Sequence, residues 1–149
     1  TLLLALTPGF APLEGDGGYP EYSSAITSFA EYCAPADFLQ LADPKVCQRV
    51  PGLIDPVEKL IGGPVSQKLE NARKFSPITY VSANCPPGLL IHGMKDPIVP
   101  VEDTTRLHAL LQAAGAPDVT MLLLEGQGHG WDRTLSEPQV LEFFKRTLA

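Results

Sequence analysis

The second half of the chain alternates between short apolar runs and segments of helical periodicity. The run Gly88–His92 (GLLIH) is continuous and apolar, which is typical of a strand buried on both faces. Over Val101–Ala114 the apolar residues recur near helical spacing, and Val119–Leu124 (VTMLLL) is a second buried-strand pattern. Pro138–Leu148 is predicted to be a final helix. This order of strand, helix, strand and helix predicts parallel strands joined by right-handed crossovers. The final helix is expected to turn four apolar side chains inward: Val140, Leu141, Phe144 and Leu148.

The first half has a looser pattern. Residues 1–7 indicate the last turns of a helix that Pro8-Gly9 ends, and Ala25–Cys33 mixes β-branched and aromatic residues as a strand does. Between residues 37 and 75 we expect short helical pieces at about 37–42, 55–61 and 64–73, separated by prolines and Gly62-Gly63.

Composition fits a single packed domain over residues 1–149. Hydrophobic residues make up 44% of the chain and charged residues 19%, which excludes disorder of the whole chain. The net charge is −6 and no segment gathers basic residues with aromatic ones, so nucleic acid is not an expected partner. The longest apolar run at either end, Leu2–Leu6, is far shorter than the ~20 residues that span a bilayer, so no membrane span is expected.

Cysteine usage suggests neither a disulfide framework nor a metal site. The three cysteines are too few for a framework, and none has CxxC spacing or a neighbouring histidine. A single Cys33–Cys47 bridge stays open, with buried free thiols as the alternative.

Polar residues follow the two apolar strands of the second half. In an open parallel sheet, functional residues lie beyond the carboxyl ends of the strands. Asp96 follows the first of these strands, and His129, with three glycines around it, follows the second. The helix and strand between them bring the two residues to adjacent strand ends. A buried carboxylate at Nδ1 of a histidine leaves Nε2 free to act as a base.

Several segments resemble the C-terminal half of α/β-hydrolase fold esterases, most closely the bacterial lipase-like and feruloyl-esterase-like members. They are Tyr32–Phe38 (YCAPADF), Ser76–Val81 (SPITYV), Leu89–Pro100 (LLIHGMKDPIVP) and Leu124–Trp131 (LEGQGHGW). The resemblance implies an α/β fold, the C-terminal part of a doubly wound sheet with about three parallel strands and flanking helices. It implies a carboxylic ester hydrolase that acts on a small ester without a metal or organic cofactor. Asp96 is then the triad acid and His129 the triad base. Residues 37–75 are expected to form an irregular helical insertion over the active-site side.

The sequence departs from this family pattern because it contains no G-x-S-x-G motif. The resemblance places the nucleophile and the oxyanion-hole loop before Thr1, so we expect the isolated chain to be inactive. Among the other histidines, His92 is expected to be a satisfied core residue and His108 a surface residue. Serines elsewhere are expected to cap helices or form turns: Ser24, Ser66, Ser76, Ser82 and Ser136.

Four residues are candidates for substrate binding. Asp37 and Phe38 follow the Ala25–Cys33 strand, while Met94 and Trp131 adjoin the two triad candidates. The alternative for Asp37 and Phe38 is a helix cap beside a core aromatic, and for Met94 and Trp131 it is ordinary packing.

Two other functions remain open from the sequence. The same motifs occur in the catalytic domain of prolyl-oligopeptidase-like serine peptidases, and a folded fragment or degenerate homologue would not be an enzyme. An open edge at the 25–33 strand predicts pairing with another chain, either as a homodimer or with a complementing N-terminal half. The compartment is not determined by these residues.

Overall fold

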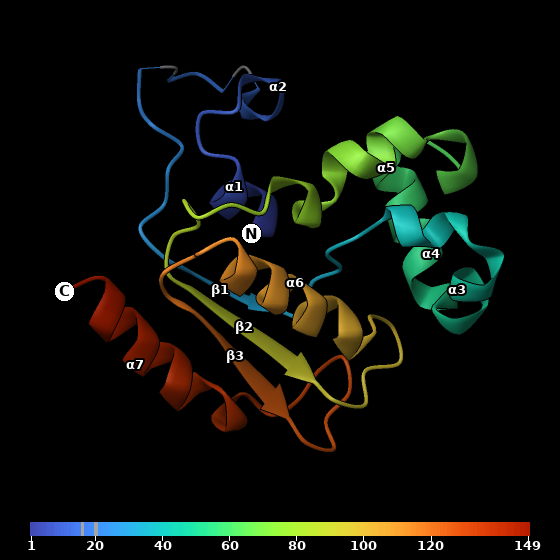
Figure 1. The fold of residues 1–149 in the computed structure, drawn as a ribbon. Helices are drawn as coiled ribbons and strands as arrows, with labels where there is room; N and C mark the ends of the chain where they lie inside the picture. Colours follow the sequence, from blue (N-terminus) through green and yellow to red (C-terminus); the bar gives the residue numbers. More distant parts are fainter. Residues whose placement is uncertain (16, 20) are drawn as a thin grey trace.

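Three parallel strands form the sheet of this protein. The computed structural model describes the chain except for residues 16 and 20. The strands are β1 (Phe29–Tyr32), β2 (Gly88–Gly93) and β3 (Val119–Leu124), and they lie in this order (Figure 1). The predicted α/β fold with about three parallel strands is therefore confirmed.

The register of the sheet places the ends of the strands together. Ile91 on the central strand β2 lies opposite Tyr32 of β1 and Leu122 of β3. All six residues of β2 are buried. Because the strands are parallel, their carboxyl ends meet at one edge of the sheet, where the loops that follow them can form a site.

Helices pack on both faces of the sheet (Figure 1). On one face, α1 (Leu2–Leu6) and α6 (Val101–Ala113) share a core with Leu90 of β2. On the other face, α7 (Glu137–Thr147) packs against Leu89 and Ile91. The alternation of inward side chains along β2 thus supplies an apolar surface to each layer of helices.

Two strands differ from their predicted form. The strand predicted over residues 25–33 is formed only over Phe29–Tyr32. The middle of β3 is partly exposed rather than buried, because β2 pairs with it on one side only.

The inward face of α7 also differs from the prediction. Phe143 is buried, whereas Leu141 and Leu148 are 57% and 60% exposed. Val140 and Phe144 do pack inward. The stripe that meets the sheet therefore runs through positions 140, 143, 144 and 147, which have i, i+3, i+4, i+7 spacing, and positions 141 and 148 lie outside it.

Residues 39–80 form a series of short helices, more continuous than the three predicted pieces. Pro44 and Pro51 occupy the first turn of a helix, where the missing N–H has no partner to lose, so these prolines begin helices instead of separating them. The elements, with η for a 3-10 helix, are η1 (Leu39–Ala42), α3 (Pro44–Arg49), α4 (Pro51–Ile61), η2 (Val65–Gln67), α5 (Leu69–Phe75) and η3 (Pro77–Tyr80).

This helical segment has its own apolar core. Leu53, Val57 and Ile61 of α4 are buried in it, together with Val99 from the loop after β2. The segment therefore packs against that loop, and Figure 1 shows it beyond the carboxyl end of β1.

Two shorter elements complete the chain: α2 (Ala11–Glu14) and η4 (Arg133–Leu135). Cys33, Cys47 and Cys85 are all free, so the Cys33–Cys47 bridge that the sequence left open is not formed. Within the described part of the chain, no helix is long and apolar enough to cross a membrane.

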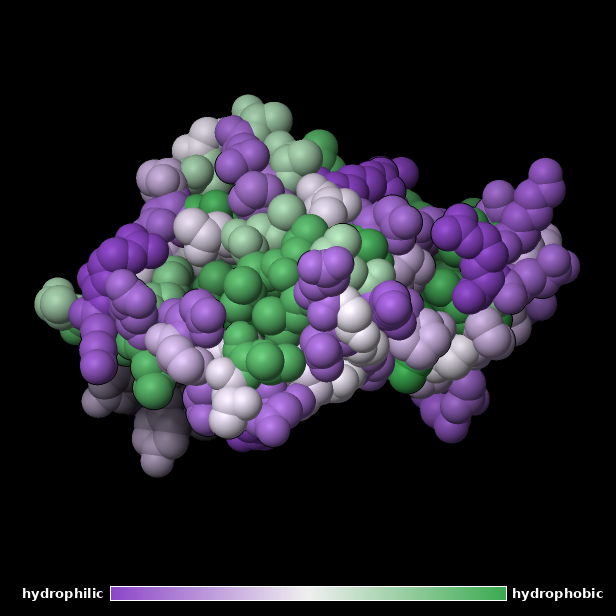
Figure 2. Space-filling model, turned by 90° about the horizontal axis from the view of Figure 1, so that it is seen from below, coloured by the Kyte–Doolittle hydropathy of each residue, from purple (hydrophilic) through white to green (hydrophobic). Residues whose placement is uncertain are grey.

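The face of the sheet that carries α7 is incompletely covered. Seen from below the view of Figure 1, an apolar area lies in the middle of the molecule (Figure 2). Ala30 of β1 and Leu122 of β3 are partly buried on this side, and Tyr32 at the end of β1 is 50% exposed. The edge strand β1 therefore borders an apolar surface.

Candidate active site

The loops that follow β2 and β3 are held in contact by their backbones. The N–H of Lys95 donates to the carbonyl of Gln127 at 2.7 Å. Gly93, the last residue of β2, approaches this second loop so closely that a Cβ atom would run into the carbonyl of Gly128. A glycine is thus required at position 93, and the close approach brings residue 129 beside residue 96.

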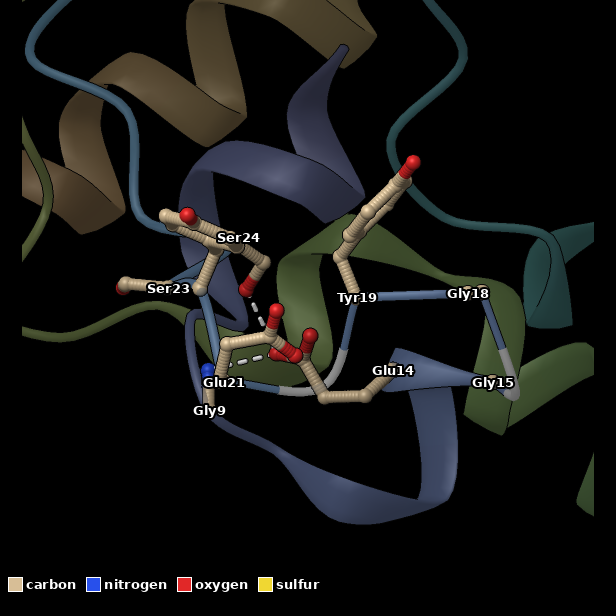
Figure 3. Close-up of a pocket in the computed structure, with 10 residues that line it drawn as sticks. Gly9, Glu14, Gly15, Gly18, Tyr19, Glu21, Ser23 and Ser24 are labelled. Carbon is tan, nitrogen blue, oxygen red and sulfur yellow. Dashed lines mark hydrogen bonds between the residues drawn. The ribbon is translucent and has the colours of Figure 1, made fainter.

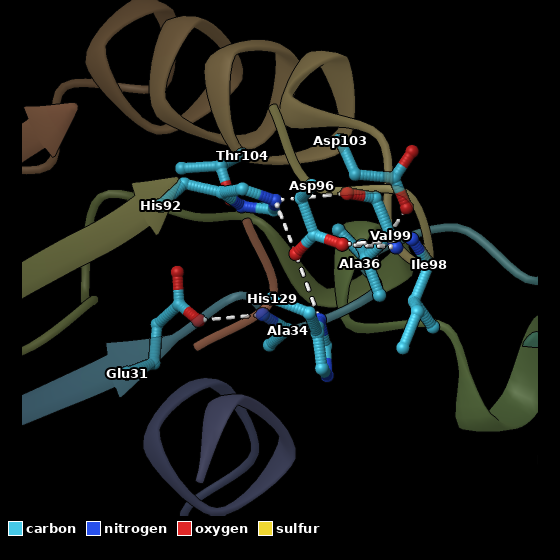
Figure 4. Close-up of polar contacts among 10 residues, drawn as sticks. All are labelled: Glu31, Ala34, Ala36, His92, Asp96, Ile98, Val99, Asp103, Thr104 and His129. Atoms are coloured by element: carbon cyan, nitrogen blue, oxygen red, sulfur yellow. Dashed lines mark hydrogen bonds and ion pairs between the residues drawn. The ribbon is translucent and has the colours of Figure 1, made fainter. Parts of the chain in front are cut away.

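Asp96 and His129 are hydrogen-bonded across these two loops. Nδ1 of His129 lies 2.7 Å from Oδ2 of Asp96 (Figure 4). The Asp96 side chain is fully buried, whereas 41% of the His129 side chain is exposed. Nε2 of His129 makes no hydrogen bond with any described residue. The predicted proximity of the two side chains is confirmed, and the pair presents a free imidazole nitrogen backed by a carboxylate.

Backbone donors hold the Asp96 carboxylate ionised. Its Oδ1 accepts the N–H of Ile98 at 2.8 Å and that of Val99 at 3.0 Å. Burial raises the pKa of Asp96, but these two N–H groups and His129 outweigh burial, so the pKa lies below its ordinary value. A charged acid at this position stabilises an imidazolium on His129 when that ring takes up a proton.

The other two histidines, His92 and His108, lie in different environments. His92 is fully buried with both ring nitrogens hydrogen-bonded, which confirms it as a satisfied core histidine. His108 is only half exposed, and its Nε2 lies 3.1 Å from the carbonyl of Val119. His108 therefore lies at the surface only in part, because α6 packs along the start of β3.

Cys33, a buried free thiol, lies at the same strand end. It has a positive φ of 50°, and its Sγ, a ring nitrogen of His92 and an oxygen of Asp96 lie within 4.8 Å of one another. Burial raises the pKa of Cys33 to about 12, which keeps the thiol protonated. The nitrogens of His92 and the oxygens of Asp96 are already hydrogen-bonded, so this cluster is better described as a hydrogen-bonded network than as a set of free metal ligands.

Met94 and Trp131, two of the candidates for substrate binding, line hollows beside the pair. A hollow of about 270 Å³ is lined by His129, Tyr32 and Trp131, and the two aromatic rings are 5.9 Å apart between centroids. Met94 is 48% exposed and lines a second hollow of about 250 Å³, with Asp96 and Arg49. The hollow beside Trp131 is mainly apolar, whereas the one beside Met94 is mainly polar because Arg49, Asp96 and Glu102 line it.

Asp37 and Phe38, also candidates for substrate binding, make contacts within the fold. Phe38 is buried in the core of the helical segment. Asp37 accepts the N–H of Leu39 at 3.1 Å and pairs with Arg106 at 2.9 Å. Neither residue lines the two hollows beside the pair. These contacts match the alternative of a cap beside a core aromatic.

Glu31 on β1 is a buried carboxyl that the sequence analysis did not single out. Its Oε2 accepts the N–H of Ala34 at 2.9 Å, and its Oε1 has no hydrogen-bond partner among the described residues. Burial raises the pKa of Glu31 to about 7, against the smaller opposing effect of the Ala34 N–H. The available signal was the two-residue alternation of the strand, which puts Glu31 on the same face as the buried Phe29 and Cys33.

A larger hollow lies in the loop between α1 and β1. It measures about 960 Å³ and is lined by residues between Gly9 and Ser24 (Figure 3). Glu14 and Glu21 both line it, and Oε1 of Glu14 accepts from the N–H of Gly9 and the hydroxyl of Ser24, each at 2.6 Å. None of its lining residues belongs to the loops that carry Asp96 or His129.

Comparison with known proteins associates the chain with esterases. The model of the family described as BD-FAE matches residues 1–111, a range that includes Asp96 and ends before His129. Esterase LipC of Mycobacterium tuberculosis is 43% identical over 60 residues, which cover 40% of this chain and 15% of LipC.

Solved structures match nearly the whole chain. A bifunctional GH43-CE protein of Bacteroides eggerthii aligns with a TM-score of 0.82 at 27% identity, over 99% of this chain and 22% of that one. A truncated form of a carbohydrate esterase from gut microbiota aligns with a TM-score of 0.78 at 22% identity, over 99% of this chain and 55% of that one. The chain therefore spans about half the length of this esterase and a smaller share of the other two relatives.

Proposed function

Since the chain belongs to the BD-FAE family, we propose that it supplies the acid and the histidine of a serine ester hydrolase. The hydrogen bond between Asp96 and His129 carries this proposal, because it joins a buried carboxylate to an exposed imidazole at the carboxyl ends of adjacent parallel strands. The esterase relatives support hydrolysis of a carboxylic ester as the reaction.

In the proposed mechanism, Nε2 of His129 acts first as a base and then as an acid. It takes the proton of a serine hydroxyl while the serine oxygen attacks the ester carbonyl carbon. The imidazolium then gives this proton to the alcohol oxygen as the ester bond breaks and the acyl-enzyme forms. Water repeats the sequence, releasing the acid and restoring the serine. Asp96 keeps the ring in the required tautomer and stabilises its positive charge.

The nucleophile is proposed to lie on polypeptide outside residues 1–149, in the same longer protein or in a second chain. Among the described residues, no serine hydroxyl is hydrogen-bonded to His129. Ser136 lines the hollow beside His129, but it is buried and its hydroxyl oxygen accepts the indole N–H of Trp131 at 3.0 Å. The oxyanion donors would come from the same outside polypeptide, so residues 1–149 alone would not turn over an ester.

Strand β1 is the proposed contact with that polypeptide. The N–H groups of Phe29 and Cys33 donate to carbonyls of the β2 side, so the backbone groups of Ala30 and Tyr32 point away from β2. The free oxygen of Glu31 and the apolar surface beside β1 lie along the same strand. A further strand on this edge would satisfy the backbone groups and cover the apolar surface.

The substrate is proposed to contact both hollows beside the pair. Trp131 and Tyr32 would face one part of the ester and Met94 the other. The helical segment over residues 37–75 would shape the Met94 side, because Arg49 of α3 lines that hollow.

Fluorophosphonate labelling tests the proposal. The complete assembly that contains residues 1–149 should form one covalent serine adduct, detected by mass spectrometry, and His129→Ala should slow labelling strongly while His108→Gln does not. A mass shift on residues 1–149 by themselves would mean that the nucleophile lies within this chain and would overturn the assignment of the serine to another segment.

A further inference from the structure

The buried His92 makes two short hydrogen bonds behind the candidate active site. Its Nδ1 lies 2.6 Å from the hydroxyl oxygen of Thr104 on α6, and its Nε2 lies 2.9 Å from the carbonyl oxygen of Val99 (Figure 4). His92 and Thr104 are both almost completely buried, so water does not compete for these bonds.

These partners determine which nitrogen of His92 carries the proton. The carbonyl of Val99 can only accept, so Nε2 must donate to it. In the neutral ring Nδ1 is then an acceptor, and the Thr104 hydroxyl donates to it. The Val99 carbonyl therefore selects the tautomer in which the N–H of His92 points toward the loop after β2, and the Thr104 hydroxyl completes the pairing of the ring by donating to Nδ1.

The same N–H is close to Asp96. Nε2 of His92 lies 3.3 Å from Oδ2 of Asp96, the oxygen that also accepts from His129. Val99, whose carbonyl accepts from His92, donates its own N–H to Oδ1 of Asp96 at 3.0 Å. His92 thus contacts the carboxylate directly and also binds the carbonyl of Val99, the residue whose N–H donates to that carboxylate.

We propose that His92, oriented by Thr104, is a positioning residue that keeps Asp96 in the place from which it accepts the hydrogen bond of His129. This inference rests on the proposed function of Asp96 and His129. It differs from a purely structural role in one respect: removal of the Thr104 hydroxyl should weaken the Asp96–His129 bond even where the fold is retained.

The test measures hydrogen exchange of the His129 Nδ1 proton by NMR, on residues 1–149 labelled with ¹⁵N-histidine. Thr104→Val removes the hydroxyl with little change in shape. Thr105→Val is the matched control, because the neighbouring hydroxyl donates only to the Glu102 carbonyl. We expect the Nδ1 proton to exchange roughly tenfold faster in Thr104→Val, in line with the loss of one buried hydrogen bond, and no change in Thr105→Val.

A second pair of variants tests the same proposal if Thr104→Val proves to be unstable. His92→Gln keeps an N–H donor near the position of Nε2 and should retain slower exchange than His92→Leu, which has no donor. Equal exchange in these two variants, equal exchange in the two threonine variants, or ¹⁵N shifts that place the His92 proton on Nδ1 would each overturn the proposal. Because no readout depends on ester turnover, failure of the proposed hydrolysis would be seen separately in the labelling experiment.

Discussion

His129 donates its Nδ1 proton to Asp96 across 33 residues of sequence, from the loop after β3 to the loop after β2. The Asp96 side chain is fully buried, whereas the His129 ring is open to solvent on its other side. This asymmetry suits a proton-transfer pair, because the buried charge stabilises the imidazolium while Nε2 stays accessible to a reacting group.

The isolated chain is predicted to lack esterase turnover. The proposed nucleophile and oxyanion donors lie outside residues 1–149, so these residues should hydrolyse p-nitrophenyl acetate no faster than a His129→Ala variant of the same chain. The measurement is the initial rate over a range of substrate concentrations. Saturable hydrolysis that depends on His129 would show that a serine of this chain, such as Ser24 or Ser82, acts as nucleophile.

Gly93 is predicted to be required for the approach of the two loops. In Gly93→Ala the new methyl group meets the Gly128 carbonyl, so the loop that carries His129 must shift, and unfolding free energy should fall by about 1–3 kcal/mol. Gly130→Ala is the matched control, since a Cβ there meets no atom within 4 Å. Urea unfolding compares the two variants. Similar stability in both would contradict the close contact at residue 93.

Glu31 is predicted to make stability depend on pH. Its pKa is about 7 when folded and 4.5 in the ordinary state, so the folded chain retains a proton that the unfolded chain releases, and stability falls as pH rises from about 4.5 to 7. Glu31→Gln removes this effect. The variant should be more stable than the parent at pH 8, by up to about 3 kcal/mol, and similar to it at pH 4. The exposed Glu70 provides the control variant Glu70→Gln. Denaturant unfolding at both pH values measures the difference. Equal stability of Glu31→Gln and the parent at pH 8 would contradict the burial of the Glu31 carboxyl.

The open edge of β1 is predicted to recruit another strand. In size-exclusion chromatography with light scattering, residues 1–149 at micromolar concentration should exceed the monomer mass, and addition of the nucleophile-bearing polypeptide should replace self-association by a mixed complex. Tyr32→Lys should weaken either association, because it places a charge beside the exposed apolar surface. A clean monomer that binds no other polypeptide would contradict this prediction.

The sequence predicted those parts of the fold that depend on the pattern of apolar residues within one element. The order of elements around β2 and β3 followed from apolar runs and helical spacing, and that order predicts Asp96 and His129 at adjacent strand ends. Glu31 was harder to interpret, because its burial depends on α1 packing over β1 and not on the polarity of its neighbours.

Other details depended on contacts that no local pattern contains. His92 was expected to be a satisfied core residue, yet its approach to Asp96 arises from the path of the loop through Val99. For Phe38 the position after a strand leaves substrate contact and a core aromatic as alternatives, and its burial depends on the separate core of the helical segment.

The most direct test of the account is the kinetics of ester hydrolysis by the complete assembly with residues Asp96 and His129 changed singly. We predict that Asp96→Asn lowers kcat by about 10³- to 10⁴-fold with little change in KM, and that His129→Ala lowers it at least as much, because both remove the proton-transfer pair. His108→Gln should retain nearly full activity. If Asp96→Asn and His129→Ala hydrolyse p-nitrophenyl acetate as fast as His108→Gln, the pair is not the catalytic acid and base. The same variants assayed on a peptide p-nitroanilide show whether the assembly prefers an amide, the result that would identify a peptidase instead of an esterase.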